Sequence, residues 1–182
     1  EWFTYFNEYN YKPHRAFGSP IILSNGYSSE ERFLSFVNTN LNDFNIPQDI
    51  VLSRKTENDK YINLDFTQYY NNLEIIDSRL YAKLTLDNKL VAFGLDIFSD
   101  ISLDVIPTIS ESMAIESASE NILSSITNKS VENNLKILPI PFNGKYDFHL
   151  VYVVRVSTQL SHGPANYICY VDANNGDLLM RM

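Results

Sequence analysis

The sequence predicts an α+β protein built from two tandem modules, each an α-helix packed on an antiparallel β-sheet. Two segments repeat apolar residues at helical spacing behind a capping signal, and alternating apolar and polar residues follow each of them. An Asn-Gly pair between apolar runs near the end is typical of a hairpin. With 182 residues, 45% of them hydrophobic, the chain can form two small cores.

The first predicted helix begins at Ser28. Ser28 and Glu31 stand in the capping-box relation, in which each side chain accepts a hydrogen bond from the backbone N–H of the other residue. Apolar residues then recur at helical spacing at Phe33, Leu34, Val37 and Leu41. The pattern predicts a helix to about Asn42, and Pro47 prevents much continuation.

Strands are expected to cover one face of this helix. Residues 61–66 and a run around 68–76 have strand character, and residues 79–86 alternate strictly between polar and apolar. The turn formers Asp87-Asn88-Lys89 then connect to a second alternating run over residues 91–97. The helix and these strands make one module.

A second copy of this plan starts at Pro107. Thr108 and Glu111 stand in the capping relation, and Ala114, Ala118, Ile122 and Ile126 recur every fourth residue, so a helix is expected over 107–126. After this helix the sequence predicts a polar stretch over 128–134, a strand over 135–140, a loop over 141–145 and a strand over 148–156. A closing hairpin joins 167–171 to 178–180, with Asn175-Gly176 in a type I′ turn. The module boundary is expected near residues 103–107.

Residues 1–27 fit neither copy of the plan. They are rich in aromatic residues and contain Pro13 and Pro20, so they are expected to have little regular structure. We expect them to pack on the first module, with packing on a partner as the alternative. The predicted organisation is therefore an aromatic N-terminal segment, 1–27, and two modules, 28–104 and 105–182.

Composition excludes several classes of function. A net charge of −8 and a pI near 4.8 argue against a nucleic-acid partner. No apolar run approaches the roughly 20 residues of a membrane-spanning helix. The single cysteine, Cys169, allows neither an internal disulfide nor a thiolate cluster and is expected to be a small buried hydrophobe.

Specific catalytic motifs are missing from the sequence. It has no His-Glu-x-x-His, no glycine-rich phosphate loop and no Gly-x-Ser-x-Gly, so we expect the chain itself not to be an enzyme and to need no cofactor. His14, His149 and His162 fit no metal-binding spacing, although a hydrolase using His149 or His162 with nearby carboxylates stays open. Asp96, Asp100 and Asp104 could in principle hold calcium, but they lack the EF-hand spacing.

Residues 65–75, DFTQYYNNLEI, followed by Ser78-Arg79-Leu80, resemble the fungalysin/thermolysin propeptide (FTP) domain. The hallmark of that domain is a glutamine, an aromatic pair, a turn and an apolar strand, which Gln68, Tyr69, Tyr70 and Asn72 match here. The family usually has glycine where Asn72 stands, and asparagine tolerates positive φ better than most residues.

The second module resembles a PepSY domain. Its elements follow the order of that family: a helix, predicted over 107–126, and then the strand LVYVVRV at 150–156. The closing hairpin also matches, with an aromatic residue before Val171-Asp172-Ala173, a turn that contains glycine, and then Leu178-Leu179. The resemblance covers residues 28–182 and implies an FTP-like domain over 28–104 and a PepSY domain over 105–182, both cystatin-like in fold.

The resemblance implies a non-catalytic propeptide of a secreted thermolysin-like zinc metallopeptidase. Such a prosegment is an intramolecular chaperone and inhibitor of the catalytic domain within a zymogen, so the expected partner is that catalytic domain, in cis or in trans, outside the cell or in its envelope. Gln68, Tyr69, Tyr70 and Asn72 are candidates for the interface, or equally for a structural turn. The alternative is a freestanding secreted or lipid-anchored PepSY-type binding or peptidase-inhibitor module.

Overall fold

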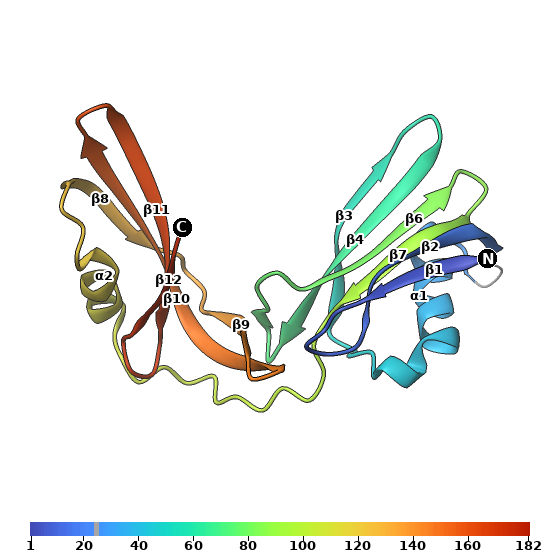
Figure 1. Ribbon diagram of the computed structural model, residues 1–182, viewed down its shortest axis with the longest axis horizontal. Coiled ribbons are helices and arrows are strands. Elements are labelled where there is room, and N and C mark those ends of the chain that lie inside the picture. Colours follow the sequence, from blue (N-terminus) through green and yellow to red (C-terminus); the bar gives the residue numbers. More distant parts are fainter. Residues whose placement is uncertain (24–25) are drawn as a thin grey trace. The chain divides into compact units, whose positions relative to one another are not determined.

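A computed structural model describes residues 1–23 and 26–182 (Figure 1). Over these residues the fold is α+β, with two antiparallel sheets and two α-helices, as predicted. The helices are α1 (Ser29–Asn40) and α2 (Glu111–Ser119), and a short 3-10 helix, η1 (Asn42–Phe44), follows α1.

Six strands of the first sheet lie in the order β1-β2-β7-β6-β4-β3. Their bounds are β1 (Trp2–Phe6), β2 (Pro13–Ile22), β3 (Ile50–Glu57), β4 (Tyr61–Tyr70), β6 (Arg79–Thr85) and β7 (Lys89–Asp96), and the two-residue β5 (Leu73–Glu74) follows β4 in the chain. The second sheet has the order β12-β11-β10-β8, and β9 also pairs with β10. Its strands are β8 (Ser125–Val131), β9 (Lys136–Phe142), β10 (Lys145–Leu160), β11 (Gly163–Asp172) and β12 (Leu178–Arg181).

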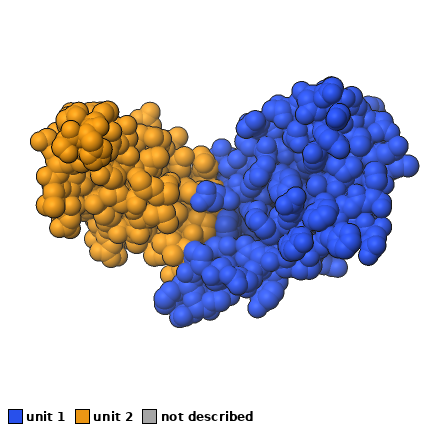
Figure 2. Space-filling view, turned by 45° about the horizontal axis from the view of Figure 1, so that its top comes forward, with its two compact units in different colours: residues 1–70, 77–101, 141–146 blue, residues 71–76, 102–140, 147–182 orange. Residues whose placement is uncertain are grey.

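The chain divides into two compact units, coloured separately in Figure 2. Unit 1 contains residues 1–70, 77–101 and 141–146, and unit 2 contains 71–76, 102–140 and 147–182. The main passage from one unit to the other lies between Ile101 and Ser102. Each unit also includes one short segment that the sequence order alone assigns to the other module.

Helix α1 begins where its capping box predicts. The Ser28 hydroxyl accepts a hydrogen bond from the Glu31 N–H at 3.2 Å, and the Glu31 carboxylate accepts one from the Ser28 N–H at 3.2 Å. Phe33 and Val37 are completely buried and form one core with apolar side chains from β4, β6 and β7. The helix therefore covers one face of the first sheet.

The expectation of little regular structure in residues 1–27 is wrong. β1 and β2 form a hairpin, and β2 pairs with β7, which brings the hairpin into the first sheet. Pro13 is the first residue of β2, and Pro20 lies where the β2–β7 register shifts between Phe17 and Ile21, so neither proline removes a donor that regular pairing needs. Buried Ala16 and partly buried Trp2 join the first core, which confirms that this segment packs on the first module.

The second helix is shorter than predicted, and its cap lies elsewhere. α2 ends at Ser119, and its N-cap is Ser110, whose hydroxyl accepts from the Met113 N–H at 3.4 Å. Thr108 lies two residues before this N-cap, where its backbone N–H donates to the Ala173 carbonyl at 2.8 Å. Residues 125–131, expected as helix end and polar loop, form β8, an edge strand that pairs with β10 and leaves its polar side chains exposed.

The terminal hairpin is present, but its predicted turn type is wrong. Of the Asn175-Gly176 pair only Gly176 has positive φ, whereas a type I′ turn needs positive φ at both central residues. Five residues connect β11 to β12, and the Asp172 carboxylate accepts hydrogen bonds from the N–H groups of Asn174 and Asn175. Among the described residues, the Asn-Gly pair with both φ angles positive is Asn143-Gly144, between β9 and β10.

The central part of the second sheet is buried on both faces. Ala114 and Ala118 of α2 pack on Leu150, Val154 and Cys169 on one side, so Cys169 is a small buried hydrophobe as predicted. Val151, Val153 and Tyr170 point to the other side, where Leu138 and Ile76 complete a separate cluster.

Candidate functional site

Gln68, the first residue of the propeptide hallmark, has a structural role in unit 1. Its side chain is only 2% exposed. Its Nε2 donates to the Phe98 carbonyl and its Oε1 accepts from the Phe98 N–H, both at 2.7 Å. Its own backbone N–H donates to the Ser78 hydroxyl at 2.9 Å. The amide thus satisfies both backbone groups of one residue just beyond the end of β7.

The other hallmark residues separate into two groups. Tyr69 and Tyr70 line a cavity of about 520 Å³ together with Gln68, beside the segment 45–49 and the segment 98–101. Asn72 does not line this cavity. Asn71 and Asn72 both have positive φ, 48° and 64°, so they form the turn after β4 that the resemblance implies, with asparagine in place of glycine.

Lys12 is a buried lysine beside this cavity that sequence reasoning missed. It is 5% exposed, and its Nζ donates to the Ser99 hydroxyl at 2.5 Å and to the Asn45 carbonyl at 3.3 Å. Burial lowers the pKa of Lys12 to about 8, against the opposing effect of the nearby Asp100 carboxylate. No local pattern marks this lysine, because its burial results from packing against residues that are distant in sequence.

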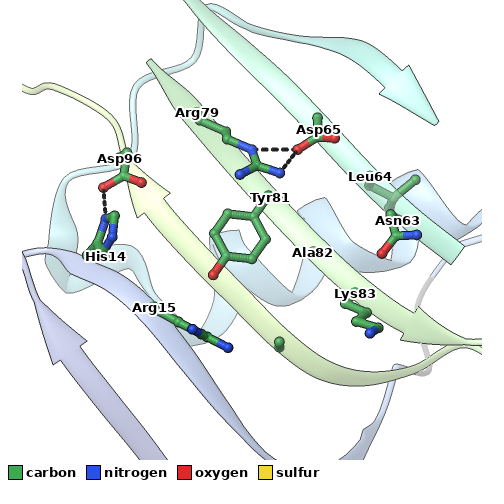
Figure 3. Close-up of a pocket in the computed structure, with 11 residues that line it drawn as sticks. His14, Arg15, Asn63, Leu64, Asp65, Arg79, Tyr81, Ala82, Lys83 and Asp96 are labelled. Atoms are coloured by element: carbon green, nitrogen blue, oxygen red, sulfur yellow. Dashed lines mark hydrogen bonds and ion pairs between the residues drawn. The ribbon is translucent and has the colours of Figure 1, made fainter. Parts of the chain in front are cut away.

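The face of the first sheet opposite α1 carries the most chemically varied side chains of unit 1. Alternation puts Ile62, Leu64, Leu80 and Ala82 in the core, so their neighbours point the other way. We call this surface the open face, and it comprises Phe3, Tyr5, His14, Arg15, Phe17, Tyr61, Asn63, Asp65, Arg79, Tyr81, Lys83, Ala92 and Asp96. It surrounds a pocket of about 340 Å³ (Figure 3).

Both carboxylates that line the pocket are engaged. Asp65 Oδ1 accepts hydrogen bonds from Arg79 Nε at 2.6 Å and from Nη2 at 2.5 Å. Asp96 Oδ1 lies 2.7 Å from His14 Nδ1. Arg15 and Lys83 also line the pocket, and neither has a carboxylate partner within residues 1–23 and 26–182. The pocket therefore has two unpaired cations.

Aromatic rings hold the cations of the open face. The Arg15 guanidinium lies 5.3 Å from the centre of the Phe17 ring, that of Arg79 lies 4.6 Å from Tyr81, and Lys83 Nζ lies 3.9 Å from Tyr61. Phe17 also stacks with Phe3 and Tyr5, whose side chains are 54% and 61% exposed. Exposed aromatic rings combined with unpaired cations are typical of binding surfaces.

Gly94 shapes the centre of this pocket. It pairs with Tyr81 across β6 and β7, and a Cβ atom at Gly94 would lie 2.2 Å from the Tyr81 ring and 2.3 Å from the His14 carbonyl oxygen. The absence of a side chain therefore lets the Tyr81 ring lie flat across β7. Figure 3 shows this ring at the middle of the pocket, with its hydroxyl directed toward β2.

The histidines do not come together. His149 Nδ1 lies 2.9 Å from Asp172 Oδ2, and its Nε2 lies 3.7 Å from Asp147. His162 is exposed in the turn between β10 and β11, and His14 contacts Asp96 in unit 1. Within the described residues, the polar contacts of His149 are to carboxylates and include no hydroxyl, thiol or amine that it could activate as a nucleophile. The contacts fit a structural role at the terminal turn.

The three aspartates considered for calcium are likewise not assembled. Asp96 contacts His14, and the Asp104 carboxylate accepts from the Ile106 N–H at 3.0 Å. In the part of the chain that the structure describes, no three His, Cys, Asp or Glu side chains are placed to hold a metal ion. Among the same residues, neither helix is long and apolar enough to cross a lipid bilayer.

Comparison with known proteins finds likenesses among solved structures. No protein-family model matches the chain, and no curated protein sequence matches it. Among solved structures, the chain is similar to the C-terminal domain of YpeB from Bacillus megaterium, with 15% sequence identity over 93% of this chain and 71% of that chain, and a TM-score of 0.42. A likeness at this level is one of fold alone and carries no information on function.

Proposed function

We propose that this chain is a non-catalytic binding module of the prosegment type, whose partner is the catalytic domain of a secreted zinc metallopeptidase. In this role it assists the folding of the catalytic domain and covers the active-site cleft until proteolysis removes it. The setting is a precursor outside the cell or in its envelope. The partner follows from the resemblance of residues 65–80 and 150–180 to the FTP and PepSY domains.

The open face is the observation that carries a binding role. Helix α1 covers one side of the first sheet, and the other side presents exposed Phe3 and Tyr5 together with the unpaired cations Arg15 and Lys83. The exposed aromatic rings are costly to leave in water, and the cations beside them are free to pair with a partner's acidic groups. A rigid sheet also holds them in place before the partner arrives, which limits the entropy lost on binding.

A preformed surface of this kind accounts for both parts of the proposed activity. A module that binds the native-like catalytic domain, and not its unfolded chain, shifts the folding equilibrium toward the native state by mass action. The same complex excludes substrate when the covered surface includes the cleft. Neither effect needs a reacting group, which agrees with the structural roles of Gln68 and of the His149–Asp172 contact.

The test is to add the chain to the catalytic domain of a thermolysin-like peptidase. Two quantities are measured: the residual peptidase activity as a function of chain concentration, and the yield of active enzyme when the denatured catalytic domain is diluted into the chain. Tyr5→Ser should weaken both effects because it removes an exposed ring from the open face. Tyr27→Ser is the matched control, since the Tyr27 side chain is fully exposed and lies outside the open face.

The possible results separate the two candidate functions. Saturable inhibition or an increased refolding yield supports the prosegment role. Binding with neither effect overturns that role and favours a freestanding binding module. Equal losses in Tyr5→Ser and Tyr27→Ser contradict the assignment of the open face as the binding surface.

A further inference from the structure

The pocket at the centre of the open face has the chemistry of a site for carboxylate. Arg15 and Lys83 line it from β2 and β6, on either side of Tyr81, and no carboxylate within residues 1–23 and 26–182 neutralises either of them. The remaining cation, Arg79, is held by Asp65, and His14 is held by Asp96. A chain with a net charge of −8 thus leaves uncompensated positive charge in this pocket.

Tyr81 supplies a neutral donor on the Arg15 side of the pocket. Its hydroxyl makes no hydrogen bond to any described residue, and Figure 3 shows it in the open part of the pocket, on the side of Arg15. Burial raises the pKa of Tyr81 above its ordinary value, an effect that the Arg15 and Arg79 charges oppose. The phenol is therefore protonated at neutral pH and can donate to an anion.

The three donors match a carboxylate better than a larger anion. A guanidinium presents paired N–H donors to the two oxygens of a carboxylate, and an ammonium and a phenol add single hydrogen bonds. The pocket volume of about 340 Å³ is near the lower end of the range for ligand sites, which is room for a side chain rather than a polymer. A nucleic acid or another long polyanion would be repelled by a chain whose net charge is −8.

The surroundings of the pocket favour a polypeptide as the source of the carboxylate. Phe3, Tyr5 and Phe17 extend the open face on the β1 side as a stack of rings, which offers apolar contact to the residues that flank an acidic side chain. A free carboxylate anion would use the cations alone and leave these rings uncovered. Charge complementarity and the aromatic stack therefore point to the same occupant.

We propose that the open face binds an acidic polypeptide segment of the partner, with an Asp or Glu carboxylate held by Arg15, Lys83 and the Tyr81 hydroxyl and the neighbouring residues lying on the Phe3–Phe17–Tyr5 stack. The inference rests on the binding role proposed above for the open face, and it does not depend on the partner being a peptidase.

Direct binding of a short peptide tests this site without any peptidase. The probe is a fluorescein-labelled Ser-Glu-Glu-Tyr-Glu-Ser peptide titrated with the full chain, and fluorescence anisotropy reports binding. The peptide in which every Glu is replaced by Gln is the ligand control. Arg15→Gln and Lys83→Gln should each weaken binding of the acidic peptide about fivefold, as expected for one solvent-accessible charge pair. Lys60→Gln is the matched protein control, because it removes the same charge from an exposed turn of unit 1 outside the pocket.

Each result has a defined reading. The site is supported if the acidic peptide binds and its binding weakens with added salt, weakens in Arg15→Gln and Lys83→Gln, and persists in Lys60→Gln. Circular dichroism verifies that the variants are folded. Four results would each overturn the site. Two concern the controls: equal affinity for the Gln peptide, or equal losses in Lys60→Gln. The other two concern the ligand: displacement by free glutamate as effective as by unlabelled peptide, or tighter binding of a labelled oligothymidylate. Peptide binding together with failure of the inhibition and refolding tests would overturn the peptidase partner and leave the carboxylate site supported.

Discussion

The Gln68 side-chain amide forms a two-way pair with the backbone of Phe98, donating from Nε2 to its carbonyl and accepting at Oε1 from its N–H, each at 2.7 Å. Both residues are buried, so water cannot replace these bonds. The pair connects β4 to the segment that follows β7. Both polar groups of the Gln68 side chain therefore form hydrogen bonds inside unit 1, although the sequence made this residue a candidate for an interface.

Replacing Gln68 by Leu should destabilise unit 1 strongly. The substitution introduces an apolar side chain of similar size and removes the partner of a buried N–H and of a buried carbonyl. We expect a loss of about 3 kcal/mol in the free energy of unfolding. Urea denaturation followed by circular dichroism measures it. Gln48→Leu is the control, since Gln48 is exposed. Similar midpoints for the two variants would show that the amide pair contributes nothing.

Lys12 should make stability depend on pH in the alkaline range. Its pKa is about 8 in the folded chain and has its ordinary value of 10.5 when the chain is unfolded. Between these values the unfolded chain binds more protons, so the free energy of unfolding rises as pH increases from about 8 toward 10.5. Below pH 8 the folded chain holds a buried charge at a cost.

The check is the difference between the wild type and Lys12→Met. Urea midpoints of both proteins are compared at about pH 7.5 and about pH 9.5, which lie on either side of the folded-state pKa. The wild type should gain stability relative to Lys12→Met at the higher pH, and the comparison cancels the titration of the tyrosines. A constant difference between the two proteins would mean that the lysine is not desolvated in the folded state.

Gly94→Ala should destabilise the first sheet. The added methyl group would lie closer than a normal contact distance to the Tyr81 ring and to the His14 carbonyl oxygen. This oxygen belongs to the backbone of β2, so it cannot move aside by a side-chain rotation. We expect a loss of about 2 kcal/mol, as for other overpacked sites. Thermal unfolding of Gly94→Ala and of Gly94→Ala with Tyr81→Ala separates the two contacts. If Tyr81→Ala fully restores the stability lost in Gly94→Ala, the loss comes entirely from the contact with the Tyr81 ring.

Ser28→Ala should cost about 1 kcal/mol of stability, because it removes the acceptor for the Glu31 N–H at the start of α1. The matched comparison is Ser110→Ala at the start of α2, where the corresponding hydrogen bond is longer, 3.4 Å. We expect the smaller loss there, measured by urea denaturation. A larger loss at Ser110 would contradict the role of the complete capping box.

The parts of the fold that were predictable from the sequence are those fixed by local patterns. The Ser28–Glu31 box marked the start of α1. Alternation along β6 and β7 identified most of their core residues, but Leu86 is exposed and Leu90, not Val91, is in the core. These signals need no knowledge of distant residues. They led directly to an α+β fold with a helix on each antiparallel sheet.

The parts that were missed depend on pairing between distant residues. β1 and β2 read as irregular because of Pro13 and Pro20, yet pairing with β7 orders them. β8 was read as a helix end and a polar loop, since an edge strand with exposed polar side chains has no apolar alternation to reveal it. The open face was not predicted either, because the cross-strand register, such as Tyr81 opposite Gly94, decides which charges meet.

Asp172, in the Val171-Asp172-Ala173 sequence that closes the chain, should be the most sensitive carboxylate of unit 2. Its Oδ1 accepts from the N–H groups of Asn174 and Asn175, and its Oδ2 contacts His149 Nδ1 at 2.9 Å. The side chain is nearly buried, so Asp172→Ala leaves these donors without an acceptor and should cost about 2 kcal/mol of stability. Urea denaturation measures the loss.

Asp172→Asn distinguishes the turn from the histidine contact. The amide oxygen of asparagine can still accept from the two turn N–H groups but no longer carries a charge for His149, so this variant should lose less than half as much stability as Asp172→Ala. Asp177→Ala is the control, because the Asp177 carboxylate accepts only from the exposed Asn175 amide within the described residues. If Asn proves as costly as Ala at position 172, the charge facing His149, rather than the turn, is what this aspartate supplies, and the closing motif exists to hold the histidine.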